Sequence, residues 1–516
     1  MRNIVKRAVT GILAVSLVAA PMGKAYAEEE TGEGTEELTL EEQLQASYDI
    51  VPDSNSIEGW PQGPQIYGHS GIVMDMDSGA VLYEKAADDQ HYPASITKML
   101  TALVALENSE LDDEVYFSED STSFLEYGDA SIGMTPGEIL SMNDALYGML
   151  LASANEVSYA IAESVGKLMG GDYNTFIQEM NDRSAELGCT GSHWVNANGL
   201  HDEQHYTTAR DMALITSALY QFDEFKTVSQ TLNYTIGETN LMKETRTFQQ
   251  NHKMLWPGNY YYYEYCTGGK TGYTDQSRTT LVTTAENAGL RLVAVILQDD
   301  GDVYVDTRSM FDYAYNNFSK VSLSDQTLPE EIESYTDQEA YVVLPNGAQF
   351  TDLEYEITQD DEQSSAGTIT YTYNGQNVGS AAVTLSESYL AGLAAENGNA
   401  DGTQADGADG RAQEEGLPLP VMMLAGAAVV IALLFIIGFV VTVKIRLDRL
   451  RRKRRRKQAR ARQMAEGRQP QNGYRVQRSG DPARPSAGAR QRRPVQNRTA
   501  PRHYEPGRRD RTGGYR

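Results

Sequence analysis

Cysteine is nearly absent from this 516-residue chain, which contains only Cys189 and Cys266. Two cysteines cannot form a disulfide framework or a four-cysteine metal site. They could pair with each other in an oxidising compartment, but their separation in the sequence does not show whether their Cα atoms approach. The sequence therefore leaves one disulfide open and excludes a four-cysteine metal centre.

Histidine is also scarce, at seven residues. His201 and His205 are four residues apart, a spacing that can bind zinc when both lie on one helix. However, Asp202 and Gln204 stand where the zinc-peptidase patterns need glutamate, and Gly199 favours a loop. We therefore expect no metal site and no cofactor.

Positive charge is missing from most of the chain. Residues 28–443 contain 15 lysines and arginines against 67 aspartates and glutamates, whereas residues 444–516 contain 25 against 5. The acidic part should repel nucleic acid and anionic lipid. The basic end should attract anionic partners, so the tail is a candidate for contact with anionic lipid.

Long apolar runs occur only twice. The first, at residues 8–20, is too short to span a bilayer and precedes a small-x-small site that ends at Ala27, as in a cleaved signal peptide. The second, at residues 421–443, would be about 34 Å long as a helix, enough to cross a hydrocarbon core about 30 Å thick. Basic residues begin at Lys444, which predicts a single span with a cytoplasmic C-terminal side and the preceding domains outside the cell.

Composition divides the rest of the chain. Residues 391–416 offer almost nothing to bury, which is typical of a flexible tether. The predicted order is a signal peptide (1–27), an acidic disordered leading segment (28–60), a main domain (61–325) with its first folded residues near Gly68, a small all-β domain (335–390), a flexible acidic linker (391–416), a transmembrane helix (421–443) and a basic disordered tail (444–516).

Strand patterns lie at both ends of the main domain. They predict one hairpin from 70–75 and 80–84 and another from 279–283 and 290–297. Apolar spacing between them predicts a helical region over about 144–168, and a closing helix is expected over 304–318. We therefore expect an α+β domain whose antiparallel sheet is built from both sequence ends.

Two shorter elements complete the prediction. Asn374 and Gly375 lie between alternating runs at 368–373 and 378–385, which is a strong hairpin signal and the basis of the small all-β domain. A short helix is expected over 38–46.

Ser95 and Lys98 are the first candidates for chemistry. They are three residues apart at the start of an apolar helix, so the amine can reach the hydroxyl and take its proton. The lysine must then be neutral, which requires burial or a second cation nearby. An ordinary capped, buried helix would have the same pattern, so partners must decide.

Two further motifs supply those partners. Ser153 and Asn155 offer a hydroxyl and an amide two residues apart, which suits a loop between helices. Lys270 would lower the pKa of the first lysine and, with the Thr271 hydroxyl, hold a substrate carboxylate. Gly272 has no side chain, so a peptide could lie against the strand edge.

In this order, Ser-x-x-Lys, Ser-x-Asn and Lys-Thr-Gly resemble the motif set of penicillin-binding proteins and class A β-lactamases. Over about residues 68–318 the chain is similar to serine-type D-alanyl-D-alanine carboxypeptidases, the low-molecular-mass penicillin-binding proteins, which implies a β-lactamase/transpeptidase-like fold. Glu156 and Ala197 depart from the usual aspartate and proline of that family. Further likeness lies in 128–134 with 136–138, 196–200 with 205–209, and 270–275.

The resemblance implies a role for each motif residue. Ser95 would be the acyl-ester nucleophile and Lys98 its general base. Ser153 would relay a proton to the leaving amine, and Asn155 would orient the substrate amide.

The third motif would bind the end of the substrate. Lys270 and Thr271 would hold the terminal carboxylate of D-Ala-D-Ala beside Gly272, and the backbone N–H groups of Ser95 and Tyr273 would form the oxyanion hole. The implied partners are a peptidoglycan stem peptide ending in D-Ala-D-Ala and β-lactam antibiotics, which would acylate the same serine.

Two alternatives stay open. A β-lactamase would share the three motifs but should add a glutamate-bearing deacylation loop, and Glu179 and Glu186 do not lie in a convincing one. A penicillin sensor would acylate once and signal inward, but the tail contains no recognisable folded domain.

Overall fold

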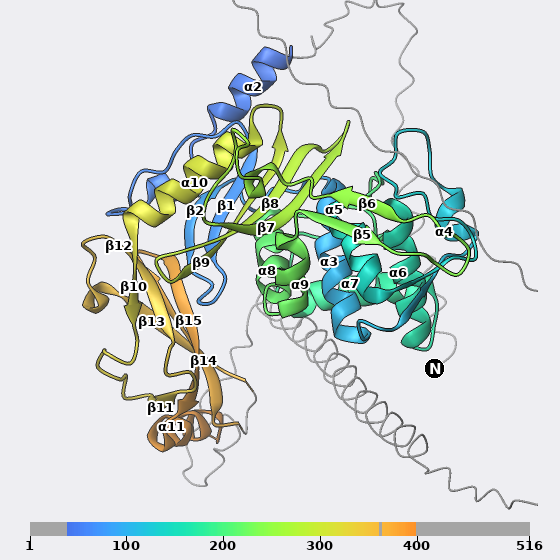
Figure 1. The fold of residues 1–516 in the computed structure, drawn as a ribbon. Coiled ribbons are helices and arrows are strands. Elements are labelled where there is room, and N and C mark those ends of the chain that lie inside the picture. Colours follow the sequence, from blue (N-terminus) through green and yellow to red (C-terminus); the bar gives the residue numbers. More distant parts are fainter. Residues whose placement is uncertain (1–38, 361–363, 399–516) are drawn as a thin grey trace, which may run out of the picture. The chain divides into compact units, whose positions relative to one another are not determined.

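The computed structural model describes residues 39–360 and 364–398 (Figure 1). The predicted signal peptide, the apolar run at 421–443 and the basic tail lie outside these residues. Within the described ranges, no helix is both long enough and apolar enough to cross a membrane.

A five-stranded antiparallel sheet forms the centre of the main body, in the order β2-β1-β9-β8-β7. In β1 and β9, Ile72 lies opposite Val295, so strands from the two sequence ends meet. This confirms the predicted hairpins and the sheet built from both ends. β7 pairs only with β8 and is therefore an edge strand. The strands are β1 (Ser70–Asp75), β2 (Val81–Lys85), β7 (Cys266–Thr274), β8 (Arg278–Asn287) and β9 (Leu290–Asp299).

The sheet is covered on both faces because successive strand residues point to opposite sides. One set of β9 side chains packs with the helical region, where α8 (Ala209–Leu219) lies against β1 and β9. The alternate set packs with α10 (Val303–Asn317), the predicted closing helix. The first set is Val293, Val295 and Leu297, and the second is Leu292, Ala294 and Ile296.

The helical region lies between β2 and β7 in the sequence. Its central helix, α3 (Thr97–Asn108), is buried from Thr97 to Ala105. The helical stretch expected over 144–168 is two helices, α5 and α6. The other elements are η2 (Ala94–Ile96), β3 (Glu114–Tyr116), α4 (Asp120–Ser123), β4 (Ile139–Ser141), α5 (Met142–Leu151), α6 (Asn155–Leu168), α7 (Tyr173–Glu186), α9 (Asp223–Gln230), β5 (Asn233–Ile236), β6 (Arg246–Gln249) and η3 (Lys253–Leu255).

The C-terminal strands form two further sheets, in the orders β10-β12 and β11-β15-β14-β13. The hairpin β14–β15 turns at Asn374 and Gly375, whose φ angles of 49° and 84° are those of the turn that Asn-Gly favours. The elements are β10 (Phe318–Ser322), β11 (Ile332–Tyr335), β12 (Tyr341–Pro345), η4 (Phe350–Asp352), β13 (Glu354–Gln359), β14 (Ala366–Tyr373), β15 (Gln376–Leu385) and α11 (Glu387–Gly398).

The structure corrects the division expected near residue 325. β10 begins at Phe318, inside the predicted main domain, yet it pairs with β12. One apolar core runs from the sheet face under α10 into the C-terminal strands, and Tyr341 Oη donates to Asp75 Oδ1 at 3.0 Å. The C-terminal strands therefore share their core with the main body.

Two segments expected to be disordered contain structure. Residues 39–60 hold α2 (Leu40–Tyr48), close to the predicted short helix, and η1 (Asp53–Ser56). Trp60 is buried and donates from Nε1 to the Leu82 carbonyl, so the folded part of the chain begins well before Gly68. Likewise α11 extends into the predicted linker, where alanine and leucine favour helix.

Candidate active site

The turn that carries Ser95 is held from two sides. Ser95 lies in η2, directly before α3, and Ala94 has a φ of 50°, which is strained for a residue with a side chain. Thr280 of β8 donates from Oγ1 to the Pro93 carbonyl at 2.9 Å. Gly199 passes so close that a Cβ there would lie 1.8 Å from the Ala94 carbonyl oxygen. These contacts fix the position of the serine.

Lys98 is fully buried one helical turn after Ser95. Its Nζ lies 2.9 Å from Ser95 Oγ, 2.8 Å from Asn155 Oδ1 and 2.6 Å from the Asn198 carbonyl oxygen. A charged amine donates to all three oxygens. A neutral amine donates to the amide and the carbonyl and keeps a lone pair for the Ser95 hydroxyl, so the site accommodates both states.

Burial holds the pKa of Lys98 well below its ordinary value, and the positive charge of Lys270 lowers it further. The carboxylates of Glu156 and Asp129 act in the opposite direction. The sequence correctly predicts that Lys270 lowers this pKa, but burial is the larger cause. Burial and the Lys270 charge thus both favour the neutral form of Lys98, which can accept a proton.

Ser153 and Lys270 form a second buried pair. Ser153 lies in the short connection between α5 and α6, as predicted, with a φ of 63°. Lys270 Nζ donates to Ser153 Oγ at 2.9 Å and to the Thr271 carbonyl at 2.8 Å. Burial lowers the pKa of Lys270 to about 7. Asn155 begins α6 and is also buried.

β7 approaches the nucleophile turn at Gly272. A Cβ there would lie 2.3 Å from Thr280 Oγ1 and 3.0 Å from the Ser95 amide nitrogen. The glycine is therefore required by the packing of β7 on this turn, a reason that its motif alone does not reveal. Thr271 is half-buried and Tyr273 is exposed on the same edge strand.

Two parts of the site could not be assigned a role from the sequence. The stretch 196–200 carries only a family likeness in the sequence, yet in the structure its Asn198 carbonyl accepts from Lys98. Glu156 binds Ser131 Oγ at 2.7 Å and the Ile132 amide at 2.8 Å, which gives the stretch 128–134 a supporting role. A backbone carbonyl can come from any residue type, so no sequence signal marks it.

His201, His205 and the two cysteines are not among the contacts of Ser95 and Lys98 described above. His205 is buried, contacts Thr97 Oγ1 at 2.8 Å and accepts from the Val195 amide, and burial lowers its pKa to about 3. His201 is exposed and in a loop, as expected. Cys189 and Cys266 are both free thiols.

Comparison with known proteins places a likeness over this site. A model of the D-alanyl-D-alanine carboxypeptidase family (Peptidase_S11) matches residues 58–301, the range that contains every side chain of the candidate site. Over these residues the chain is similar to this carboxypeptidase family, and its mixed α/β body is of the transpeptidase-like kind.

Individual members of the D-alanyl-D-alanine carboxypeptidase family are distant relatives. DacF of Bacillus subtilis (strain 168) is 26% identical over 314 residues, covering 57% of this chain and 77% of DacF. DacC of Escherichia coli (strain K12) is 25% identical over 359 residues, covering 64% of this chain and 86% of DacC. The crystal structure of Streptomyces K15 DD-transpeptidase matches with a TM-score of 0.45 and 25% identity, over 50% of this chain and 100% of that one.

Proposed function

We propose that the protein is a serine-type D-alanyl-D-alanine carboxypeptidase that removes the terminal D-alanine from peptidoglycan stem pentapeptides. The observation that carries this proposal is the fully buried Lys98 amine, 2.9 Å from Ser95 Oγ and with a lowered pKa. The likeness to the carboxypeptidase family suggests the reaction class, and this contact supplies the activated nucleophile.

Acylation begins when Lys98 accepts the Ser95 proton and Oγ attacks the carbonyl carbon between the two D-alanines. The oxyanion is stabilised by the backbone N–H groups of Ser95 and Tyr273. The C–N bond then breaks, and the proton that Lys98 accepted from Ser95 passes through Ser153 to the departing amine. Asn155 uses Oδ1 for Lys98, so it presents its amide N–H groups to the substrate.

The terminal carboxylate selects the end of a peptide. Protonated Lys270 and the Thr271 hydroxyl bind it, which favours cleavage of the last residue over internal bonds. The carboxylate in turn favours the charged form of Lys270, whose pKa in the free enzyme is about 7.

Water hydrolyses the acyl-enzyme and releases the shortened peptide. Lys98, neutral again once the amine has left, accepts a proton from the attacking water and returns it to Ser95 Oγ as the ester breaks. A β-lactam also has a reactive amide carbonyl and a carboxylate, so it acylates Ser95 in the same pocket, and slow hydrolysis of that ester makes the drug an inhibitor.

The setting of the enzyme rests on the sequence. Residues 421–443 form a single membrane span, residues 39–398 lie outside the cell, and residues 444–516 face the cytoplasm with a basic tail that contacts anionic lipid. β10–β15 precede this apolar run in the sequence.

The decisive experiment measures D-alanine release by the purified full-length protein from a pentapeptide ending in D-Ala-D-Ala. Wild type and Ser309→Ala, a control serine on α10, should release D-alanine at equal rates, and Ser95→Ala should release none. Stable labelling of Ser95 by a fluorescent penicillin without D-alanine release would contradict the proposal in favour of a sensor or transpeptidase. Rapid turnover of nitrocefin without D-alanine release would favour a β-lactamase.

A further inference from the structure

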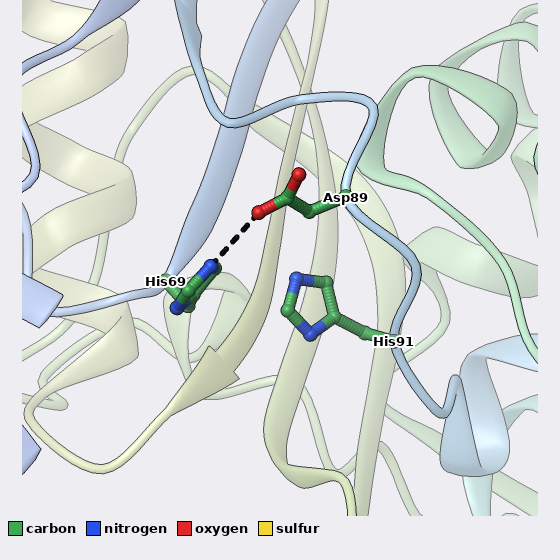
Figure 2. Close-up of side chains that lie close together, drawn as sticks. All are labelled: His69, Asp89 and His91. Carbon is green, nitrogen blue, oxygen red and sulfur yellow. Dashed lines mark hydrogen bonds and ion pairs between the residues drawn. The ribbon is translucent and has the colours of Figure 1, made fainter.

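Three potential metal ligands meet outside the active site: His69, Asp89 and His91 (Figure 2). His69 directly precedes β1, and the other two lie in the loop after β2. One ligand atom from each side chain lies within 4.8 Å of the other two. His69 Nε2 is 3.0 Å from Asp89 Oδ2, the contact that the dashed line marks in Figure 2.

The donor set suits a zinc-type ion. Two imidazoles and one carboxylate are borderline ligands that late divalent transition metals bind well, and a water completes a tetrahedral shell. Ligand atoms around tetrahedral zinc are about 3.3 Å apart. Small rotations of the three side chains would therefore bring their ligand atoms from within 4.8 Å of one another to the spacing that a zinc ion requires.

Neighbouring groups already orient the ligands. Ser70 Oγ lies 2.8 Å from His91 Nε2 and donates to the Ala86 carbonyl at 2.6 Å. The Gln298 backbone carbonyl accepts from the His69 amide at 3.2 Å. The φ of Gln298 is 53°, a strained value of the kind that gathers at functional sites. Such outer contacts hold the imidazoles of metal sites in place.

The site is reachable and lies in a favourable field. The His69 and Asp89 side chains are 31% and 59% exposed, so an ion can enter from solvent. The excess of acidic residues between positions 28 and 443 attracts cations to the surface.

His91 also connects this cluster to the nucleophile. It lies four residues before Ser95, and its backbone exchanges two hydrogen bonds with Thr207, at 2.8 and 2.9 Å. An ion bound to Asp89 and His91 would tie the segment that leads into Ser95 to the start of β1.

We propose that His69, Asp89 and His91 bind one divalent ion of the zinc type and that the ion positions the segment leading into Ser95. The binding step is independent of the carboxypeptidase activity. The positioning step requires only that Ser95 be acylated by a penicillin.

The test uses full-length protein without a histidine tag, stripped of metal and titrated with Zn²⁺ by calorimetry. Wild type should bind one equivalent, and His91→Ala should bind at least about tenfold more weakly. His193→Ala is the matched control because its imidazole, which contacts the Gln204 carbonyl, lies outside the cluster. Absence of saturable one-to-one binding, or equal binding by the double variant His69→Ala, His91→Ala, would overturn the site.

Cobalt provides a readout that does not depend on losing the ligand. The His69→Cys variant replaces an imidazole by a thiolate, so its Co²⁺ complex should gain a sulfur-to-metal charge-transfer band that wild type lacks. A spectrum identical to that of wild type would place the ion elsewhere.

Acylation tests the positioning role. Zinc should accelerate labelling of Ser95 by a fluorescent penicillin about fivefold in stripped wild type and leave the rate of His91→Ala unchanged. Zinc binding without any change in the wild-type rate would refute the positioning role and leave the binding site standing.

Discussion

Two buried lysines of this protein have nearly the same local geometry and opposite consequences. Lys85 Nζ donates to three backbone carbonyls, of Ser47, Ile66 and Gly68, at 2.7 to 2.8 Å. Lys98 likewise has three oxygen neighbours, but one of them is the hydroxyl of Ser95. Both side chains are fully buried.

The charged neighbour with the largest effect differs in sign between the two lysines. Burial lowers the pKa of Lys85 to about 8, and the carboxylates of Asp306 and Asp299 oppose that shift. For Lys98 the second cause, the Lys270 cation, adds to burial. Burial alone therefore does not make a lysine a base. Two features distinguish Lys98 from Lys85. Lys98 has a neighbouring cation, Lys270, and it contacts a hydroxyl, that of Ser95, which can give up a proton.

The largest expected effect comes from Lys98→Met, which keeps the side-chain length and removes the base. Acylation by a penicillin should slow by about 10³-fold while the protein remains folded. Stopped-flow measurement with a fluorescent penicillin, with circular dichroism as the folding control, checks this. A rate within tenfold of wild type would show that Lys98 is not the base.

Lys85→Met should instead reduce stability. Three buried carbonyls lose their donor, so the free energy of unfolding should fall by about 3 kcal/mol, and the rate per folded molecule should stay unchanged. Denaturant unfolding measures the first quantity and titration of active sites the second. A catalytic loss without a stability loss would erase the distinction between the two lysines.

Lys270→Met tests the contribution of the second cation. Without it the pKa of Lys98 should rise toward its ordinary value, so the acidic limb of the acylation profile should move to higher pH. At the acidic end the variant should be about tenfold slower than wild type. A pH profile with an unmoved acidic limb would contradict the coupling.

The wild-type profile should also show an alkaline limb. As pH rises through about 7, Lys270 loses its proton in the free enzyme, so binding of the substrate carboxylate should weaken and KM should rise. The measurement is KM for the pentapeptide across this range. A constant KM would mean that the cation does not bind the carboxylate.

Glu156→Gln should have the smallest effect and the opposite sign to Lys270→Met. The glutamate raises the pKa of Lys98, so its neutral replacement should move the acidic limb to lower pH and speed acylation at the acidic end about threefold. The glutamine oxygen can still accept from Ser131 and Ile132, which keeps the fold intact. A shift of the acidic limb toward higher pH would show that Glu156 acts through its hydrogen bonds to Ser131 and Ile132 and not through its charge.

The sequence was most informative where side chains act at short spacing. The contact between Ser95 and Lys98 and the loop position of Ser153 could be predicted. Both follow from helix geometry and turn preference, which depend on neighbouring residues. The Asn198 carbonyl could not, since the main chain carries no residue signature. The order around Trp60 could not be predicted, because its acidic surroundings suggest disorder although the side chain is buried.

The cluster of His69, Asp89 and His91 also depends on contacts that the sequence does not reveal. Asp89 and His91 are two residues apart, and in an extended segment their side chains point the same way. His69 joins them only because β1 and β2 pair, so the third ligand depends on tertiary structure.

The pairing of β1 with β9 has a consequence for biogenesis. Val295 must find Ile72 across more than two hundred residues, so the sheet has a high contact order and should close slowly. A nascent chain already carries its serine and its lysine when it lacks the edge strand that supports them. Acylation by penicillin should therefore require that β9, the last strand of the sheet, has been made and paired. A chain arrested before residue 290 should not be acylated.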